Sequence, residues 1–305
     1  LGDKDEGIGI AAINNGNLKT SANIKVTGTG VKKVGVYNEG DTAEISGGTI
    51  TVSGEDSAGI LNKKTAKFTA DTTIEALDGT TGIFSNGGSG NNVAATGGKA
   101  VTVKVTDNRT GSTVKRGVGV YATDGSNVTI PNATIDVNGG SSALVATAGS
   151  KIDVKAGVVK YKGEGYAFYT GDSKVGTGKI DASSSTVTLD GKAVGFEVDG
   201  NGGSYSSNVT LTGATVNINS DDVILMSVVK PYTTKLSDFD SVLNKASGLS
   251  SSSITGSTNY KLGVISGLNG AHSFKFDTPL DKKDAVSNAS SQSYKYVRNL
   301  ILQRS

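Results

Sequence analysis

The 305-residue chain contains no cysteine and no tryptophan, and it has one histidine and three prolines. Without cysteine it can form neither a disulfide framework nor a thiolate metal site, and it has no cysteine nucleophile. The single histidine, His272, excludes a zinc site built from several imidazoles. A Ser-His-acid triad would need His272, and no Gly-x-Ser-x-Gly elbow lies beside it. We therefore expect no catalytic residues, no metal ion and no cofactor.

An excess of charge of one sign is also missing, because 30 basic and 28 acidic residues leave a net charge of +2. Nucleic-acid-binding domains carry a marked basic excess, so we expect no nucleic-acid partner. No run of 18 apolar residues occurs, which argues against a membrane-spanning helix. The sequence begins Leu1-Gly2-Asp3-Lys4 without the pattern of a signal peptide. We interpret the chain as a fragment of a longer protein.

Glycine, by contrast, is abundant at 43 residues, and a small residue followed by an apolar one returns at regular steps. The first numbers of successive pairs differ by 26, 24, 23, 37, 24, 24 and 28. A period in this range is typical of a solenoid, in which each repeat stacks on the one before it. The pairs are Gly9-Ile10, Gly35-Val36, Gly59-Ile60, Gly82-Ile83, Gly119-Val120, Ala143-Leu144, Ala167-Phe168 and Gly195-Phe196.

Each repeat also contains segments in which apolar and polar residues alternate, as strands with one buried face do. One series is Ile24–Val26, Ile50–Val52, Ile74–Ala76, Val103–Val105, Ile135–Val137, Val159–Tyr161, Val187–Leu189 and Val216–Ile218. A weaker series is Ala43–Ile45, Val128–Ile130, Ile152–Val154 and Val209–Leu211. Three short strands per repeat predict an all-β fold, a parallel β-helix of about nine or more rungs. Its coil is expected to be right-handed, the hand that parallel crossovers prefer.

Val36 and its counterparts are expected to point into the coil, together with the residues two positions further on. Asn38 and Asn62 belong to this second inward column, and stacked amides can hydrogen-bond along the axis. The residue between the two inward columns then points outward. That outward column reads Ala11, Tyr37, Leu61, Phe84, Tyr121, Val145, Tyr169 and Glu197.

An apolar and aromatic stripe on an outer face is unusual for a soluble rod. We therefore take five of its residues as candidate binding residues, with the tyrosines as anchors. They are Tyr37, Leu61, Phe84, Tyr121 and Tyr169. Two alternatives stay open: a loop or the C-terminal segment covers the stripe, or the register is reversed and the stripe is core.

Two parts of the chain depart from the repeat. The 37-residue step predicts insertions within 85–92 and 106–111, and insertions in solenoids form loops. Residues 1–229 form the predicted β-helix, whereas 230–305 differ. Ser237 resembles a helix N-cap and predicts a short helix at about 238–247. Further strands are expected at Tyr260–Ile265, Ser273–Phe276 and Tyr294–Val297, with another buried run at Leu300–Leu302, so that this segment continues or caps the coil.

Three segments carry a resemblance to a known family: Gly-Val-Tyr-Asn at 35–38, Gly-Ile-Leu-Asn at 59–62 and Gly-Gly-Thr-Ile-Thr-Val at 47–52. With the Thr-rich rungs, they resemble passenger domains of bacterial type V autotransporters, and most nearly the large fusobacterial outer-membrane adhesins of the RadD-like group. The resemblance implies secretion through a C-terminal β-barrel outside this stretch and display on the bacterial cell surface. It also implies attachment to a host-cell receptor or to other bacteria.

Three functions follow as hypotheses: an adhesive module, a stalk that only projects an adhesive tip, and a polysaccharide-degrading enzyme. Such enzymes on β-helices cluster several carboxylates on one outer face of adjacent rungs. The outward acids Glu44, Glu75, Asp136, Asp153 and Asp190 are instead dispersed over different columns. We favour the adhesin and expect no enzymatic activity.

Overall fold

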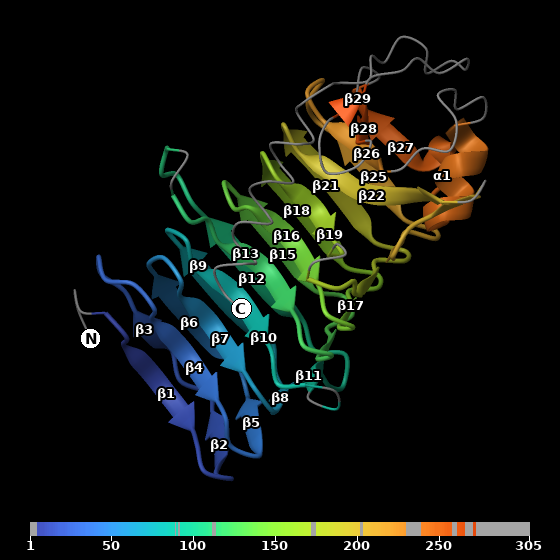
Figure 1. The fold of residues 1–305 in the computed structure, drawn as a ribbon. Coiled ribbons are helices and arrows are strands. Elements are labelled where there is room, and N and C mark those ends of the chain that lie inside the picture. The colour runs from blue at the N-terminus through green and yellow to red at the C-terminus, as the bar shows by residue number, and fades with distance from the viewer. Residues whose placement is uncertain are drawn as a thin grey trace.

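The computed structural model is a parallel β-solenoid of eight complete three-strand turns, followed by a partial turn that contains the helix (Figure 1). It describes residues 5–88, 90, 92–111, 114–171, 175–201, 204–229, 239–257, 261–265 and 271–272. Each complete turn gives one strand to each of three sheets, which we name A, B and C. The predicted all-β, parallel β-helix is confirmed, and the right-handed sense of the coil stays a prediction.

The strands of each sheet follow one another in steps of one turn. Sheet A contains β1 (Ile8–Ala12), β4 (Val34–Asn38), β7 (Ala58–Asn62), β10 (Thr81–Ser85), β13 (Val118–Ala122), β16 (Ser142–Ala146), β19 (Tyr166–Tyr169), β22 (Val194–Asn201), β26 (Ile224–Val229), β28 (Lys261–Ile265) and β29 (Ala271–His272), with β23 (Ser204–Ser206) forming a hairpin on β22. Sheet B contains β2 (Asn17–Thr20), β5 (Thr42–Ile45), β8 (Thr65–Phe68), β11 (Asn92–Ala95), β14 (Asn127–Thr129), β17 (Lys151–Asp153), β20 (Lys179–Asp181) and β24 (Val209–Thr210).

Sheet C contains β3 (Ile24–Val26), β6 (Gly48–Ser53), β9 (Thr72–Leu77), β12 (Val101–Thr106), β15 (Thr134–Asn138), β18 (Val158–Gly163), β21 (Thr186–Gly191), β25 (Thr215–Ile218) and β27 (Ile254–Gly256). The surplus residues of the long fourth step lie between β10 and β11 and between β12 and β13, as the two predicted insertions require.

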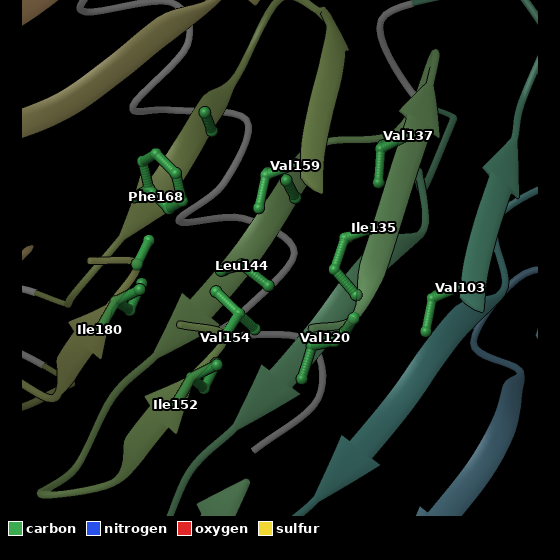
Figure 2. Close-up of a cluster of buried hydrophobic side chains, with 14 of the residues drawn as sticks. Val103, Val120, Ile135, Val137, Leu144, Ile152, Val154, Val159, Phe168 and Ile180 are labelled. Carbon is green, nitrogen blue, oxygen red and sulfur yellow. The ribbon is translucent and has the colours of Figure 1, made fainter. Parts of the chain in front are cut away.

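The interior is one continuous apolar core to which all three sheets contribute. Figure 2 shows its middle part, where Leu144 of sheet A, Ile152 of sheet B and Ile135 of sheet C belong to the same cluster. Alternation along each strand supplies these side chains, because every second residue faces inward. The predicted inward column of Val36, Ile60 and their counterparts is confirmed.

The small residue of the repeated pair packs directly against a side chain of sheet C and the next strand of sheet A. A Cβ atom built on Gly35 would lie 2.5 Å from Cγ2 of Ile50 and 2.6 Å from the carbonyl oxygen of Gly59. Both Gly35 and Val36 therefore face the interior, and the strand departs locally from strict alternation. Ala143 and Ala167 occupy this position in two later turns and are fully buried. The Gly-Ile signature thus marks a backbone approach that excludes large side chains.

The second inward column holds a buried ladder of polar side chains. The side-chain amide of Asn38 donates to the side-chain oxygen of Asn62 at 2.8 Å, and that of Asn62 reaches the hydroxyl of Ser85 at 3.3 Å. All three residues are fully buried. The expected amide stacking is confirmed, and it gives partners to the amide nitrogens of Asn38 and Asn62, which would otherwise be costly to bury.

The predicted helix is present as α1 (Phe239–Ser247), followed by the 3-10 turn η1 (Ser251–Ser253). It follows β26 of sheet A and precedes β27 of sheet C, so it takes the place of a sheet B strand. The backbone N–H of Leu211 donates to the carbonyl of Ser247 at 2.6 Å, and Leu243 and Leu249 join the interior cluster. β28 matches the expected strand at 260–265. The expected strands at 273–276 and 294–297 and the run at 300–302 lie outside the described residues.

Candidate functional surface

The five candidate binding residues lie on the outer face of sheet A, in register from turn to turn. Tyr37 pairs with Leu61, Leu61 with Phe84, and Phe84 with Tyr121, while Tyr169 follows two strands later. Leu61, Phe84, Tyr121 and Tyr169 belong to an apolar cluster separate from the interior core. The register is therefore the predicted one, and the reversed alternative, which would place the stripe in the core, is wrong.

Burial divides the five residues into two groups. Phe84, Tyr121 and Tyr169 are only 7%, 2% and 1% exposed, although they point away from the interior. Tyr37 and Leu61 are partly exposed. The rings of Phe84 and Tyr121 lie with their centroids 4.9 Å apart. The end of the stripe nearest the N-terminus is thus open to solvent, whereas its middle is covered.

A second outward column on the same face was missed by sequence reasoning. It holds apolar residues three positions before those of the stripe: Val34, Ala58, Val118, Tyr166, Val194 and Ile224. The ring centroids of Tyr166 and Tyr169 lie 5.6 Å apart. In each strand, the two residues between these columns both point inward, as Gly35 and Val36 do in β4. The residues on either side of them therefore both lie on the outer face. An apolar residue directly before the small one, present in six of the eight repeated pairs, was the signal that could have revealed this column.

Tyr37 belongs to a small group of polar and aromatic side chains on the surface. Its hydroxyl donates to the carboxylate of Glu39, and the Lys63 ammonium lies 5.5 Å from the ring centroid. Lys63 and Glu39 also form an ion pair at 3.5 Å. Partial burial and the bond to Glu39 raise the pKa of Tyr37, while the hydroxyl and Lys63 lower the pKa of Glu39. The group presents an aromatic ring flanked by both charges.

The insertion between β12 and β13 builds a charged corner that the sequence did not reveal. The buried carboxylate of Asp107 receives the Arg109 guanidinium at 2.7 and 2.9 Å, and the same guanidinium binds Glu55 at 2.8 Å. Lys115 pairs with Asp56 at 2.7 Å. These bonds fix the insertion onto the turn between β6 and β7, two turns earlier. The carboxylates of Glu55, Asp56 and Asp107 each form an ion pair with a basic side chain, as in a structural ion-pair network.

The surface beside this corner is hollowed. A depression of about 150 Å³ is lined by Arg116, Glu164 and Ser141 together with four glycines. The guanidinium of Arg116 donates to the carbonyls of Gly139 and Arg109 at 3.0 and 2.8 Å. Most pockets that enclose a small molecule are larger, about 300–1,000 Å³. This depression therefore offers a poor enclosure for a small-molecule substrate.

On sheet B, two carboxylates of neighbouring turns share one lysine. Asp153 and Asp181 are paired in register, and the Lys155 ammonium lies 3.3 and 3.1 Å from their carboxylates. The pKa of Asp181 is lowered, since hydrogen bonds from Ser183 and Lys155 outweigh its partial burial. Glu44 lies on sheet B, whereas Glu75, Asp136 and Asp190 are spread over sheet C. No group of three or more metal-ligating side chains occurs among the described residues.

His272 lies in β29, which pairs with β28 at the end of sheet A. Within the described part of the chain, no helix has the length and apolar character needed to span a membrane. The chain matches no protein-family model, no curated protein and no solved structure. The relation to autotransporter passengers therefore stays a prediction from the sequence.

Proposed function

We propose that the chain is a rod-shaped module of a bacterial cell-surface adhesin that attaches the cell to host cells or to other bacteria. The observation that carries this proposal is the unbroken coil, in which sheet A runs in parallel pairing from β1 to β28. Such a quasi-one-dimensional body is extended, and each turn is held by its neighbours. A protein of this shape suits contact at a distance from the membrane.

The surface that we assign to attachment is the open end of the stripe, Tyr37 and Leu61 with Glu39 and Lys63. Tyrosine is enriched among residues that dominate protein interfaces, because it combines a large apolar ring with a polar tip. Lys63 and Glu39 hold the ring of Tyr37 in place before a partner arrives. A preformed group loses less side-chain freedom on binding. The fitting partner is a protein surface with a matching apolar pocket and charges at its rim.

Binding of the fluorescently labelled chain to epithelial cells, immune cells and partner bacteria, measured by flow cytometry, tests the proposal. We expect saturable binding to at least one cell type and a clear loss of it in Tyr37→Ser and in Leu61→Ser. Lys160→Ser, on the exposed face of sheet C, is the matched control and should bind as the unchanged chain does. Equal binding by all variants would show that the adhesive surface lies elsewhere on the chain.

The burial of Phe84, Tyr121 and Tyr169 favours a second candidate function, that of a stalk. If the middle of the stripe never meets a partner, the coil serves to project another part of the protein. Absence of binding to every cell type, from protein shown by circular dichroism to be folded β-structure, would support the stalk and contradict the adhesive module.

A further inference from the structure

The outer face of sheet C carries a column of alternating charge. The column lies on four neighbouring strands, β9, β12, β15 and β18, whose residues are paired in register (Figure 1). Along these strands it reads Glu75, Lys104, Asp136 and Lys160. An uncharged threonine stands at either end of the run, Thr51 on β6 and Thr188 on β21. When the run is read from its other end, every sign is therefore reversed.

These charges are not neutralised by one another within the sheet. Lys104 and Lys160 are exposed, and Glu75 and Asp136 are half-buried. In the part of the chain that the structure describes, no ion pair joins any two of the four, although their strands are in register. The carboxylate of Glu75 instead accepts a hydrogen bond from the hydroxyl of Thr51 at 3.0 Å. The face thus presents an ordered row of charges to its surroundings.

We propose that this face binds the same face of a second copy of the chain, with the two rods antiparallel. A two-fold axis along the strands, midway between β12 and β15, lays each column over itself in reverse order. Lys104 then faces Asp136 of the second copy, and Glu75 faces Lys160 of the second copy. Symmetry repeats each contact, so that four pairs of opposite charge form.

The charges also select this arrangement over its alternatives. With parallel rods about a two-fold axis along the rod, every charge of the column would face its own copy. Antiparallel rods shifted by one turn would bring Lys104 against itself or Asp136 against itself. Like charges that face each other across an interface suppress the wrong register. The sign pattern therefore specifies both the direction and the register of the pairing.

The two flanking columns are compatible with this register. On one side, the axis places Lys162 against Leu77 of the second copy, and Asp190 against Ser53 of the second copy. On the other side, the side chains are short and uncharged, which lets the two faces approach: Thr49, Thr73, Thr102, Thr134, Val158 and Thr186.

The size of the face predicts a weak contact. Seven steps of about 4.8 Å from β3 to β25 give a length of about 34 Å, and five residues of a strand give a width of about 17 Å. Two such faces bury roughly 1,100 Å² together, which is the size of weak and transient complexes. Many copies displayed on two surfaces would strengthen the contact through avidity.

The antiparallel order has a consequence for cells, which rests on the proposed function. Rods anchored on one cell stand parallel, whereas rods on two facing cells overlap antiparallel. The alternating charges would therefore join cells that both display the chain, and they would not gather the rods of one cell. The partner of sheet C is then a like cell, in addition to the contact assigned to Tyr37 on sheet A.

Sedimentation velocity of the full chain over a series of concentrations tests the pairing in solution. We expect dimers that dissociate as salt is raised. Lys104→Glu should weaken dimerisation about tenfold or more, because two carboxylates then face each other, and Asp136→Lys should do so through two ammonium groups. Lys67→Glu, at an exposed position of sheet B, is the matched control and should dimerise as the unchanged chain does. Monomers under all conditions, or full dimerisation of Lys104→Glu, would overturn the proposal.

A mixture of the two charge-reversed variants separates a lost contact from a damaged fold. In a pair with one molecule of each, the carboxylate introduced at position 104 faces the ammonium introduced at position 136, and the native Asp136 faces the native Lys104. Mixing should therefore restore the dimer that neither variant forms alone. Failure to restore it, with both variants folded by circular dichroism, would contradict the charge pairing.

The absence of native cysteine allows the direction of the rods to be measured. Thr51→Cys and Thr188→Cys chains, mixed and treated with a short bismaleimide, should be joined to one another, because these positions face each other in antiparallel rods. Joining of Thr51→Cys chains among themselves would indicate parallel rods and would overturn the proposal.

Two variants distinguish this contact from the adhesive surface. Lys160→Ser should weaken dimerisation and leave binding to epithelial cells unchanged, whereas Tyr37→Ser should do the reverse. The dimer is measured without cells, so either proposal can fail while the other holds. Undiminished dimerisation of Lys160→Ser would contradict its pairing with Glu75.

Discussion

The side-chain amide nitrogen of Asn38 lies 2.8 Å from the side-chain oxygen of Asn62, one turn along the coil and fully out of water. The amide of Asn62 in turn donates to the backbone carbonyl of Lys64 at 2.7 Å. This bond connects the stacked side chains to the backbone of the corner that follows β7. The ladder also fixes the register of neighbouring turns, because a slip by one residue would bury an unpaired amide.

Asn62→Leu should destabilise the coil by about 1–3 kcal/mol, the usual cost of leaving buried polar groups without partners. Here the groups that lose a partner are the Asn38 amide, which keeps only its bond to the carbonyl of Thr65, and the carbonyl of Lys64. Chemical denaturation followed by circular dichroism measures the change. Asn138→Leu, at an exposed position of β15, is the control and should change stability by less than about 0.5 kcal/mol. Equal effects would show that the ladder contributes nothing specific.

Gly59→Ala should also destabilise, by about 1–3 kcal/mol, as overpacking of a core does. The new methyl group would lie 2.4 Å from Cγ2 of Ile74 and 2.7 Å from the carbonyl oxygen of Gly82. Ala143→Gly in the same column is the matched control. It removes a methyl group that is already accommodated and should cost only about 0.5–1 kcal/mol. Thermal unfolding of the two variants under one set of conditions provides the comparison, and a milder effect of Gly59→Ala would contradict the close approach of the sheets.

Arg109→Met should be the most damaging change at the charged corner. It would leave the buried Asp107 carboxylate without its closest cation, and breaking a buried pair costs about 3–5 kcal/mol when no other partner compensates. Arg116, whose guanidinium lies 3.9 Å from Asp107, should reduce the loss somewhat. Adding Asp107→Asn should restore part of the stability, since the unpaired charge is then gone. Denaturation of the single and double variants tests this, and additive losses would contradict it.

The pH dependence of stability should show the contribution of Glu44. Its hydrogen bond and ion pair with Lys19, at 2.7 Å, hold the pKa of the carboxyl below its ordinary value. A lowered carboxyl pKa stabilises the fold above the unfolded-state pKa, and this stability is lost as pH falls through the folded-state pKa. The unchanged chain and Glu44→Gln should therefore differ near neutral pH and converge in acid. Parallel curves at every pH would contradict the shift.

The repeat was predictable because its physical cause is local. Each small residue marks a close backbone approach, and each alternating segment marks a half-buried strand, so period and strand type follow from residue order alone. The inward direction of Val36 and the pairing of Asn38 with Asn62 follow from the same alternation. The helix at 239–247 was predictable from the helical spacing of its apolar residues.

What escaped prediction depends on contacts between distant residues. The column containing Val118 and Tyr166 was hidden because two successive inward residues break the alternation. The bond of Arg109 to Glu55 joins positions 54 residues apart, and nothing in the order of residues marks that pair. The burial of Tyr121 likewise involves residues of other turns, among them Phe84, whose ring centroid lies 4.9 Å away.

The hydrogen bonds between turns run along the axis of the rod, and this has a mechanical consequence. A pull on the two ends of the chain acts on the outermost turn first, because inner turns are held from both sides. One turn of about 24 residues rises only about 4.8 Å in the coil but reaches roughly 80 Å when peeled off and extended. Under load such a rod would lengthen in discrete steps of about one turn each, while the turns still in place keep their structure.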